Sequence, residues 1–314
     1  MSLYLSEQDV GRLVDVADAV TALEEVFGQW GRDGTENLPR QRLPLPVRSL
    51  NLMAASAPSL GICGHKAYFG GCAYVSLFSL EESRLLALIE ASTLGAIRTG
   101  AASGVATKYL ARPDAATVGI IGTGRQAKTQ LLAMAAVRSL QSVRVFGRDE
   151  ERRTAFAGEM AEVLSCTVQA TDSAEACVRD ADIVIAATKA SDPVVFGDWL
   201  SPGTHVNAIG ANGYARRELD DVAVLRASLV ATDQRDQART EARELIDLAE
   251  AGKLDWANVV ELGALVQGEI AGRAQDSDIT LFKSLGIALE DIAFAKLIYD
   301  RAVAAGAGTK IQTD

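Results

Sequence analysis

The feature that most constrains the fold of this chain is a short apolar run that turns through two glycines into a helical pattern. The run is Thr-Val-Gly-Ile-Ile, residues 117–121, and apolar side chains at positions 131, 132 and 135 form one face of the helix that follows. The turn and the first helical residues are Gly122, Thr123, Gly124, Arg125, Gln126 and Ala127. A buried strand, a glycine turn and an amphipathic helix in this order are typical of a parallel α/β sheet.

The two glycines suit the pyrophosphate of a dinucleotide. Gly122 permits a tight turn, and Gly124 lets backbone N–H groups come close to a bound phosphate. Ala127 lets the helix pack near the strand, so that the helix N-terminus, with its unpaired N–H groups and positive dipole end, faces the phosphates. We therefore expect a dinucleotide site; a glycine turn without a ligand is the alternative. The other residues expected to line this site are Thr123, Arg125 and Gln126.

The same alternation continues toward the C-terminus. The strands that we expect are 142–146, 183–187, 205–209 and 229–232, and a helix is expected at 152–163. Strands that alternate with helices indicate a doubly wound parallel sheet of the Rossmann type. The break Ala-Arg-Pro-Asp at 111–114 marks the start of this domain.

The first 110 residues follow a different pattern. Ser6 and Asp9 have the spacing of a capping box, which predicts a helix start. Residues 37–91 carry short apolar runs broken by proline and glycine, and this predicts antiparallel strands and hairpins. Helices are expected at 93–110 and again in the tail at 281–305. The fold class is therefore α/β, a Rossmann sheet with a second α+β domain.

The end of the second Rossmann strand bears on which dinucleotide binds. NAD enzymes usually place Asp or Glu there for the ribose 2′-hydroxyl. This chain has Gly147 at that place and Arg148 next to it, and a guanidinium suits a 2′-phosphate. The sequence favours NADP(H), and NAD(H) stays possible because Asp149 follows. A solvated surface arginine is the other interpretation of Arg148.

Charge and cysteine content exclude several classes of partner. The formal net charge is −10, which disfavours nucleic acid and anionic membranes but not a small anionic substrate held by a few arginines. The four cysteines show no CxxC spacing and there are two histidines, so we expect no metal site and reduced thiols. No secretory signal and no long apolar span is visible. We expect a cytoplasmic protein.

Basic residues in the first domain are candidates for holding a substrate anion. Arg40 and Arg42 stand among prolines and leucines, and Lys66 stands between apolar segments. Arg98 and Thr99 lie near the start of a helix made otherwise of small residues. A cation among small residues suggests that an anion fits against it, although each one alone is as consistent with a snorkelling surface side chain.

Taken together, these segments resemble the ornithine cyclodeaminase/mu-crystallin family. The resemblance covers nearly the whole chain, in order, and is far more specific than the glycine motif. The similar blocks are Pro39–Arg42, Gly64–Lys66, Ile97–Ser103, Ile120–Ala127, Ala181–Val184, His205–Gly210, Arg217–Leu219 and Phe282–Gly286. The resemblance implies a homodimer with two domains per chain. Residues 1–114 and about 287–314 would form the substrate-binding and dimerisation domain, and 115–286 the Rossmann domain.

The resemblance also implies roles for individual residues. Lys66 would face the substrate and donate a proton or bind a carboxylate, and Arg98 would hold the α-carboxylate through two parallel hydrogen bonds. Arg42 would be the second carboxylate partner, with Arg40 close enough to leave the choice open. The residues implied to contact the cofactor are Thr99, Thr188, Ser284 and Leu285.

One position departs from the cyclodeaminase pattern. Cyclodeaminases and related alanine dehydrogenases carry Asp in a Gly-x-Asp segment where this chain has Gly210-Ala211-Asn212. Asp acts as a general base, whereas the amide of Asn212 only orients an imine or a water through hydrogen bonds. Mu-crystallin-like members, which reduce cyclic ketimines, also lack that Asp. The departure favours reduction of a small cyclic imino acid by a nicotinamide cofactor.

Three alternatives stay open. The chain could be an ornithine cyclodeaminase, or an open-chain amino-acid dehydrogenase such as an alanine dehydrogenase. It could also be a non-catalytic protein that binds a nucleotide and a small acid, although the intact pair of Lys66 and Arg98 argues against this.

Overall fold

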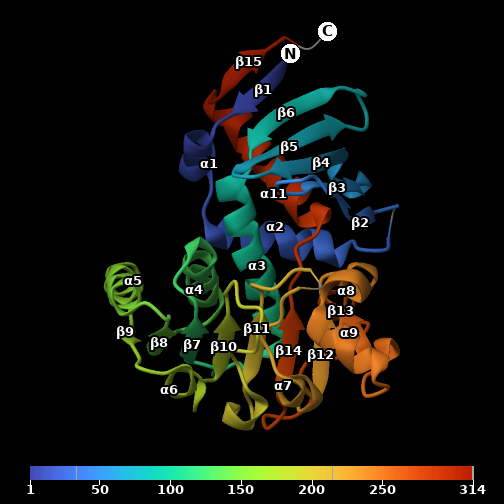
Figure 1. Ribbon diagram of the computed structural model, residues 1–314. Helices are drawn as coiled ribbons and strands as arrows, with labels where there is room; N and C mark the ends of the chain where they lie inside the picture. The colour runs from blue at the N-terminus through green and yellow to red at the C-terminus, as the bar shows by residue number, and fades with distance from the viewer. Residues whose placement is uncertain (33, 214, 313–314) are drawn as a thin grey trace. The chain divides into compact units, whose positions relative to one another are not determined.

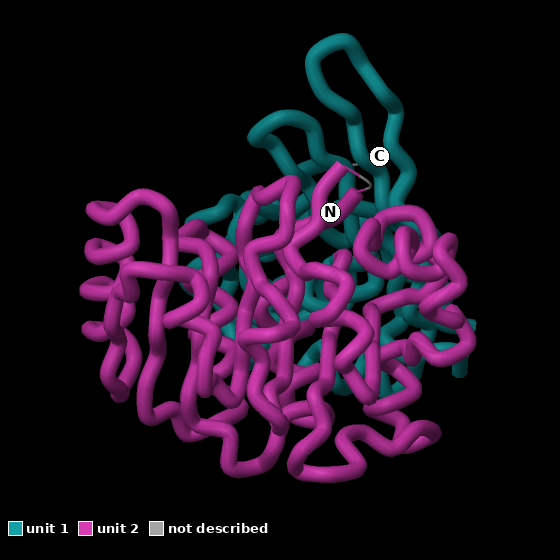
Figure 2. The backbone as a smooth tube through the Cα atoms, turned by 60° about the horizontal axis from the view of Figure 1, so that its bottom comes forward, with its two compact units in different colours: residues 1–98, 286–314 teal, residues 99–285 magenta. Residues whose placement is uncertain are grey.

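The computed structural model describes residues 1–32, 34–213 and 215–312. Its contacts divide the chain into two compact units, Met1–Arg98 with Gly286–Asp314 and Thr99–Leu285 (Figure 2). The first unit thus joins two segments that are far apart in the sequence, whereas the second is one continuous stretch. Each unit has its own sheet.

The first unit is a seven-stranded sheet with helices. Its strand order is β15-β1-β6-β5-β4-β3-β2, and β2 to β6 pair antiparallel in sequence order. The strands are β1 Ser2–Leu5, β2 Glu36–Leu43, β3 Leu50–Ala57, β4 Ile62–Phe69, β5 Cys72–Ser79, β6 Leu85–Glu90 and β15 Thr309–Ile311. The helices are α1 Glu7–Leu13, α2 Val16–Gly28, the start of α3 Ser92–Leu110, and α11 Ala288–Ala305. The expected capping box of Ser6 and Asp9 is present at α1.

The two faces of this sheet differ. Met53, Lys66, Val75 and Ile89 stand in register on neighbouring strands and are buried. Helix α11 covers this inner face, where it contacts β3, β4 and β5 (Figure 1). Because side chains alternate along a strand, the neighbouring positions occupy the outer face. Three large side chains there, Leu52, Phe69 and Tyr74, are exposed.

The second unit is an eight-stranded sheet in which every pairing is parallel. Its order is β13-β12-β14-β11-β10-β7-β8-β9. The strands are β7 Thr117–Ile121, β8 Ser142–Phe146, β9 Thr167–Ala170, β10 Ile183–Ala186, β11 His205–Ala208, β12 Leu229–Thr232, β13 Val259–Glu261 and β14 Thr280–Lys283. The helices are the rest of α3, α4 Arg125–Val137, α5 Glu150–Val163, α6 Ala174–Val178, α7 Asp221–Leu225, α8 Arg235–Glu241, α9 Arg243–Glu250 and α10 Leu262–Val266. The predicted doubly wound parallel sheet is confirmed.

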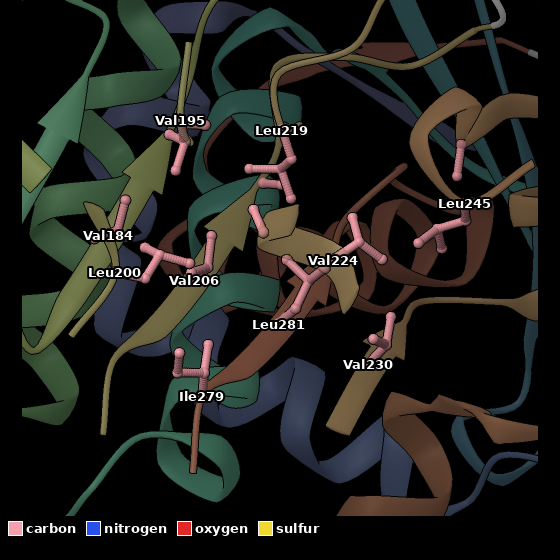
Figure 3. Packing of buried hydrophobic residues seen from close by; sticks show 14 of the residues in the cluster. Val184, Val195, Leu200, Val206, Leu219, Val224, Val230, Leu245, Ile279 and Leu281 are labelled. Atoms are coloured by element: carbon pink, nitrogen blue, oxygen red, sulfur yellow. The ribbon is translucent and has the colours of Figure 1, made fainter. Parts of the chain in front are cut away.

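A continuous apolar core packs against the strands of this second sheet. Figure 3 shows Val184 on β10, Val206 on β11 and Leu281 on β14 packed with neighbouring residues, all of them buried. Leu245 of α9 belongs to the same cluster. Strands buried on both faces read as continuous apolar runs, which is why the sequence identified most of them.

Several element predictions were wrong or incomplete. The tail is not helical from 281: residues 280–283 form β14, and helix α11 begins only at Ala288. Strands β1, β9, β13 and β15, of three or four residues each, were not predicted. Runs this short do not show whether their period is that of a strand or of a helix.

The unit boundary falls inside helix α3, between Arg98 and Thr99, and not at the break at 111–114. The second half of α3 packs on α4: Gln130 Nε2 donates to the Thr99 carbonyl at 3.0 Å. A Cβ on Gly100 would lie 2.5 Å from the carbonyl oxygen of Thr129. This close packing assigns residues 99–110 to the second unit.

Candidate functional site

The glycine motif lies where the strand order of the second sheet reverses. From β7 the chain continues to β8 and β9 on one side, and then returns to β10 on the other side of β7. Gly122 follows β7 with φ +119°, and a Cβ there would lie 2.3 Å from the carbonyl oxygen of Ala187, just after β10. The carboxyl ends of strands at such a reversal are where ligands bind in open α/β sheets.

The N-terminus of α4 has the form that a phosphate requires. Gly124 is its N-cap, and no side chain accepts a hydrogen bond from the first turn. The later helices α8, α9 and α10 also lack a side-chain cap, but among these four helices only α4 has a glycine at the N-cap. A Cβ on Gly124 would meet nothing within 4 Å, so there is room for an anion against the free N–H groups. The residues present fit a dinucleotide pyrophosphate.

The end of β8 offers no acidic side chain to a ribose. A Cβ on Gly147 would lie 3.0 Å from Cγ2 of Thr123, so a larger residue here would require Thr123 to shift. Asp149 is engaged as the cap of α5, where its carboxylate accepts the N–H of Arg152 at 3.0 Å. Arg148 is exposed. The one cation that directly follows Gly147 is therefore accessible to a phosphate group.

A buried carboxylate ties two further strand ends together. Glu218 accepts hydrogen bonds from the N–H and the hydroxyl of Thr188 at 2.6 and 2.7 Å. It also accepts the N–H groups of Gly210 and Ala211 at 2.6 and 3.0 Å. Burial raises the pKa of Glu218, against the charge of Lys283 and the hydrogen bonds of Thr188. Four hydrogen bonds fix the segments that carry Thr188 and Asn212.

A buried lysine holds the same segment from β14. Lys283 Nζ donates to the Ala211 carbonyl at 2.7 Å and to Glu244 at 3.0 Å, and both charged side chains are fully buried. Asn212 follows directly and is exposed. Glu218 and Lys283 lie within segments that resemble the family, but the sequence predicts no role for either. Buried charges are not distinguishable from surface charges in a sequence.

The residues expected to contact the cofactor are likewise held by hydrogen bonds or buried. Leu285 N–H donates to Asp233 at 2.5 Å, and both Ser284 and Leu285 are buried. The hydroxyl of Thr188 donates to Glu218 and accepts the N–H of Ala190 at 3.1 Å. Thr99 is buried, and its carbonyl accepts from Gln130. All four residues that the resemblance implied belong to the second unit.

The first unit gathers five ionisable side chains. Lys66 Nζ and Arg98 Nε both lie 2.9 Å from Oδ1 of Asp291. Arg98 Nη1 lies 2.7 Å from Oε2 of Glu290, and Arg40 Nη2 donates to the carbonyl of Gly286 at 2.9 Å. All five side chains are buried. We call these five residues, three of them basic and two acidic, the cation cluster.

Burial and charge act against each other in this cluster. Burial lowers the pKa of Lys66, as do the positive charges of Arg98 and Arg40, whereas Asp291 raises it; the result is a lowered pKa. For Asp291, burial works to raise the pKa, but Arg98 and Lys66 outweigh it and hold the pKa below its usual range. The carboxylate is thus ionised, and the ammonium is an acid stronger than a solvated lysine.

Arg40, and not the expected Arg42, is the arginine of the cluster. The pairing of β2 with β3 shifts between Leu38 and Gln41, so that one extra residue stands on β2. This bulge turns Arg40 to the inner face, where Nε also contacts Sδ of Met53 at 3.5 Å. Arg42 lies two residues further along and is exposed. Arg42 pairs with Asn51 and lies on the same face as Arg40, so the two arginines differ in their place along the strand and in burial, which the sequence does not show.

Two glycines make room for the cations. A Cβ on Gly286, which has φ +72°, would lie 2.3 Å from Nη1 of Arg98. A Cβ on Gly95 would lie 2.8 Å from Nζ of Lys66. The close approach of both cationic groups to backbone therefore depends on residues without side chains.

Metal ligands do not gather within residues 1–32, 34–213 and 215–312. That part of the chain holds no group of three or more His, Cys, Asp or Glu that could bind a metal ion. The four cysteines are free, and none of the described helices is long and apolar enough to cross a membrane.

Comparison with known proteins agrees with this geometry. The model of the ornithine cyclodeaminase/mu-crystallin family matches residues 2–306. A Δ1-pyrroline-2-carboxylate reductase of Bacillus cereus is 42% identical over 240 residues, which are 76% of this chain and 73% of that protein. The structure of the Thermococcus litoralis Δ1-pyrroline-2-carboxylate reductase with NADH and L-proline has a TM-score of 0.94 at 33% identity, covering 98% of this chain and 100% of the other. An archaeal alanine dehydrogenase dimer with bound NAD has a TM-score of 0.92 at 30% identity and 99% coverage of both chains.

Proposed function

Because this chain belongs to the ornithine cyclodeaminase/mu-crystallin family, we propose that it reduces a small cyclic imino acid with a nicotinamide dinucleotide. The substrate that we propose is a pyrroline or piperideine carboxylate. The observation that carries the proposal is the cation cluster. It brings three buried basic side chains, Lys66, Arg98 and Arg40, together in the first unit, and basic groups gathered in this way suit the carboxylate of a small imino acid.

The cluster supplies two of the requirements of imine reduction. The guanidinium groups of Arg98 and Arg40 hold the carboxylate and fix which face of the ring is presented. Lys66 gives a proton to the ring nitrogen, and its lowered pKa makes it a better donor than a solvated lysine. The dinucleotide, when bound, supplies the hydride that the imine carbon accepts. The C=N bond becomes a saturated C–N bond as carbon gains the hydride and nitrogen the proton.

Asn212 favours reduction over cyclodeamination. Release of ammonia from ornithine needs a base, and a neutral amide is a negligible base near neutral pH. Reduction of a preformed cyclic imine needs only one proton, which Lys66 provides. The Bacillus relative carries the name of a pyrroline carboxylate reductase, and the Thermococcus structure holds L-proline; both support a five-membered ring.

For the cofactor we propose NADP(H) in preference to NAD(H). The structural neighbours bind NADH or NAD, so the nicotinamide dinucleotide is the common element. The preference for the phosphorylated form rests on Gly147 in the place of the acid, on the exposed cation Arg148, and on the engagement of Asp149 as a helix cap. We assign the contacts to the pyrophosphate to the N-terminus of α4.

A homodimer formed through the outer face of the first sheet completes the proposal. Leu52, Phe69 and Tyr74 are 44%, 44% and 37% exposed on that face, which is unusual for large apolar side chains on neighbouring strands. The alanine dehydrogenase neighbour is a dimer. A second copy of the chain would remove this surface from water.

The test compares two reactions of the pure protein. Oxidation of NADPH is followed with 1-pyrroline-2-carboxylate, and proline and ammonia are measured by mass spectrometry after incubation with ornithine and NAD. We expect rapid NADPH oxidation and little proline from ornithine. Robust proline formation from ornithine alone would reverse the assignment and make the protein a cyclodeaminase.

A further inference from the structure

Asp291 belongs to the cation cluster, but the proposed reaction uses only Lys66, Arg98 and Arg40. It lies in the first turn of α11, next to Glu290, and both carboxylates are fully buried. The positive end of the helix dipole favours an anion at this place. One of its oxygens, Oδ1, accepts from Lys66 and from Arg98, each at 2.9 Å. Lys66, proposed to protonate the ring nitrogen, and Arg98, proposed to hold the carboxylate, thus share a single acceptor atom.

The other oxygen of Asp291 indicates that this arrangement does not serve stability alone. Oδ2 is buried and has no hydrogen-bond partner among the described residues. A buried acceptor without a partner costs about 1–3 kcal/mol. Buried ion pairs are in any case poor stabilisers compared with apolar residues of similar volume. The presence of this carboxylate is better explained by the hydrogen bonds that Oδ1 accepts from Lys66 and Arg98.

We propose that Asp291 is a positioning residue that aims Lys66 and Arg98 and holds the Lys66 ammonium in its charged form until the substrate takes the proton. This inference rests on the proposed imine reduction. Asp291 does not touch the substrate; it acts through the lysine. Lys66 has one hydrogen-bond partner among the described residues, and that partner is Asp291, so its remaining N–H donors are available to a substrate.

The groups around Lys66 make Asp291 the one that decides its charge. Arg98 on α3 and Arg40 on β2 disfavour a third positive charge, and burial acts in the same direction. Tyr68 on the same strand places its ring 5.9 Å from Nζ. Glu290 forms its ion pair with Arg98. The charge and the hydrogen bond of Asp291 are what raise the pKa of Lys66 against these effects.

Loss of the Asp291 charge should make kcat fall at a lower pH than in the wild type. Reduction needs protonated Lys66, so kcat falls as the pH rises through the pKa of this group in the enzyme–substrate complex. Asp291→Asn keeps the shape and removes the negative charge, so Lys66 loses its proton at lower pH. We expect the alkaline limb of the kcat profile to move down by about one to three pH units, the range for loss of a nearby opposite charge.

Glu290→Gln is the matched control. It removes the neighbouring buried carboxylate, which pairs with Arg98 but not with Lys66. We expect a higher KM for the imino acid and an alkaline limb at the wild-type position. Titration of the substrate itself is common to both variants and cancels in the comparison. Equal displacement of the limb in both variants, or no displacement in Asp291→Asn, overturns the inference.

Asp291→Glu separates charge from position. It keeps the carboxylate and moves it by one methylene, so we expect the limb near its wild-type position and a kcat lowered at least tenfold. A kcat and KM equal to those of the wild type would show that the position of the carboxylate does not matter and would overturn the positioning role. This variant decides the question also if Asp291→Asn does not fold.

A measurement without turnover keeps the inference apart from the proposed function. The lysine side-chain carbons of the wild type and of Asp291→Asn are labelled with carbon-13 and titrated by NMR, and the Lys66 signal is assigned by its loss in Lys66→Met. We expect the Lys66 signal of Asp291→Asn to titrate at lower pH. If no imine is reduced but this difference is found, the proposed function fails and the charge-holding role of Asp291 stands. If imines are reduced and the signals titrate alike, the role of Asp291 fails.

Discussion

The two candidate binding sites of this molecule are built from different parts of the polypeptide. We call residues 122–127, the glycine turn and the start of α4, the dinucleotide cradle. It presents backbone N–H groups at the start of α4, with glycines in place of side chains. The cation cluster of the first unit consists of five buried ionisable side chains. A backbone site tolerates many side chains but few changes of backbone conformation. A side-chain site depends on the identity of each residue and on the balance of its charges.

The largest expected effect breaks the cation cluster at its proton donor. Lys66→Met removes the donor and keeps an apolar side chain of similar length. Loss of a general acid lowers turnover by about 10²–10⁴-fold, whereas binding of the dinucleotide should stay within a factor of about two because no residue of the cradle changes. Steady-state NADPH oxidation and a fluorescence titration with NADPH check the two expectations. A variant that keeps most of its turnover would remove Lys66 from the mechanism.

The next effect breaks the cradle through its backbone. Gly122→Ala places a Cβ 2.3 Å from the carbonyl oxygen of Ala187 at a φ of +119°, and a strained backbone alone costs about 1–3 kcal/mol. The expected result is a lower free energy of unfolding in urea together with weaker dinucleotide binding. Gly124→Ala is the control, because its Cβ would meet nothing within 4 Å. We expect it to unfold like the wild type; equal destabilisation of both variants would contradict the geometry.

A third prediction sharpens the composition of the cluster. Arg40→Ala removes a buried guanidinium beside Lys66, and a lost charge-assisted hydrogen bond to a carboxylate costs about 1.5–3 kcal/mol. The KM for the imino acid should rise by roughly 10–150-fold. Arg42→Ala removes an exposed side chain of the same strand and should change KM by less than about threefold. Initial rates over a range of imino-acid concentrations decide it, and the reverse order would return the role to Arg42.

The smallest expected effect concerns Arg148, the side chain proposed to bind the 2′-phosphate of NADP(H). Arg148→Ala should weaken NADPH by about tenfold, the lower end of the range for a charge-assisted bond at an exposed site. Binding of NADH should hardly change, since it carries no 2′-phosphate. Calorimetric titrations of both dinucleotides with both proteins provide the comparison. Tighter binding of NADH than of NADPH by the wild type would contradict the proposed preference.

The contrast between the two sites explains what the sequence predicted well. Strand β7, the glycine turn and helix α4 are consecutive, so every requirement of the cradle lies within about twenty residues of chain and follows a local pattern. Parallel strands buried on both faces are also visible as apolar runs. The cradle and most of the Rossmann sheet were therefore predictable from local order alone.

The cation cluster was predictable only in part. Lys66, Arg98, Arg40 and Arg42 stood out as basic residues among apolar or small ones, and the family resemblance implied their roles. The partners of the cations were not, because Asp291 lies 225 residues from Lys66 and Glu290 lies 192 residues from Arg98 in the sequence. Nothing local distinguishes these two acids from the solvated face of a helix. The bulge in β2, which turns both arginines to the inner face, likewise depends on pairing with β3, and burial of Arg40 alone separates it from Arg42.

The division of the first unit between two distant segments sets an order in time for synthesis. Residues 99–285 are continuous and complete their unit first, whereas the sheet of the first unit lacks α11 and β15 until the last segment is made. At about 5–20 residues per second, the 225 residues between Lys66 and Asp291 take roughly 10 to 45 seconds to translate. During that interval the nascent chain carries Lys66 and Arg98 without their shared counter-ion, on a sheet whose inner face has no helix α11 to cover it.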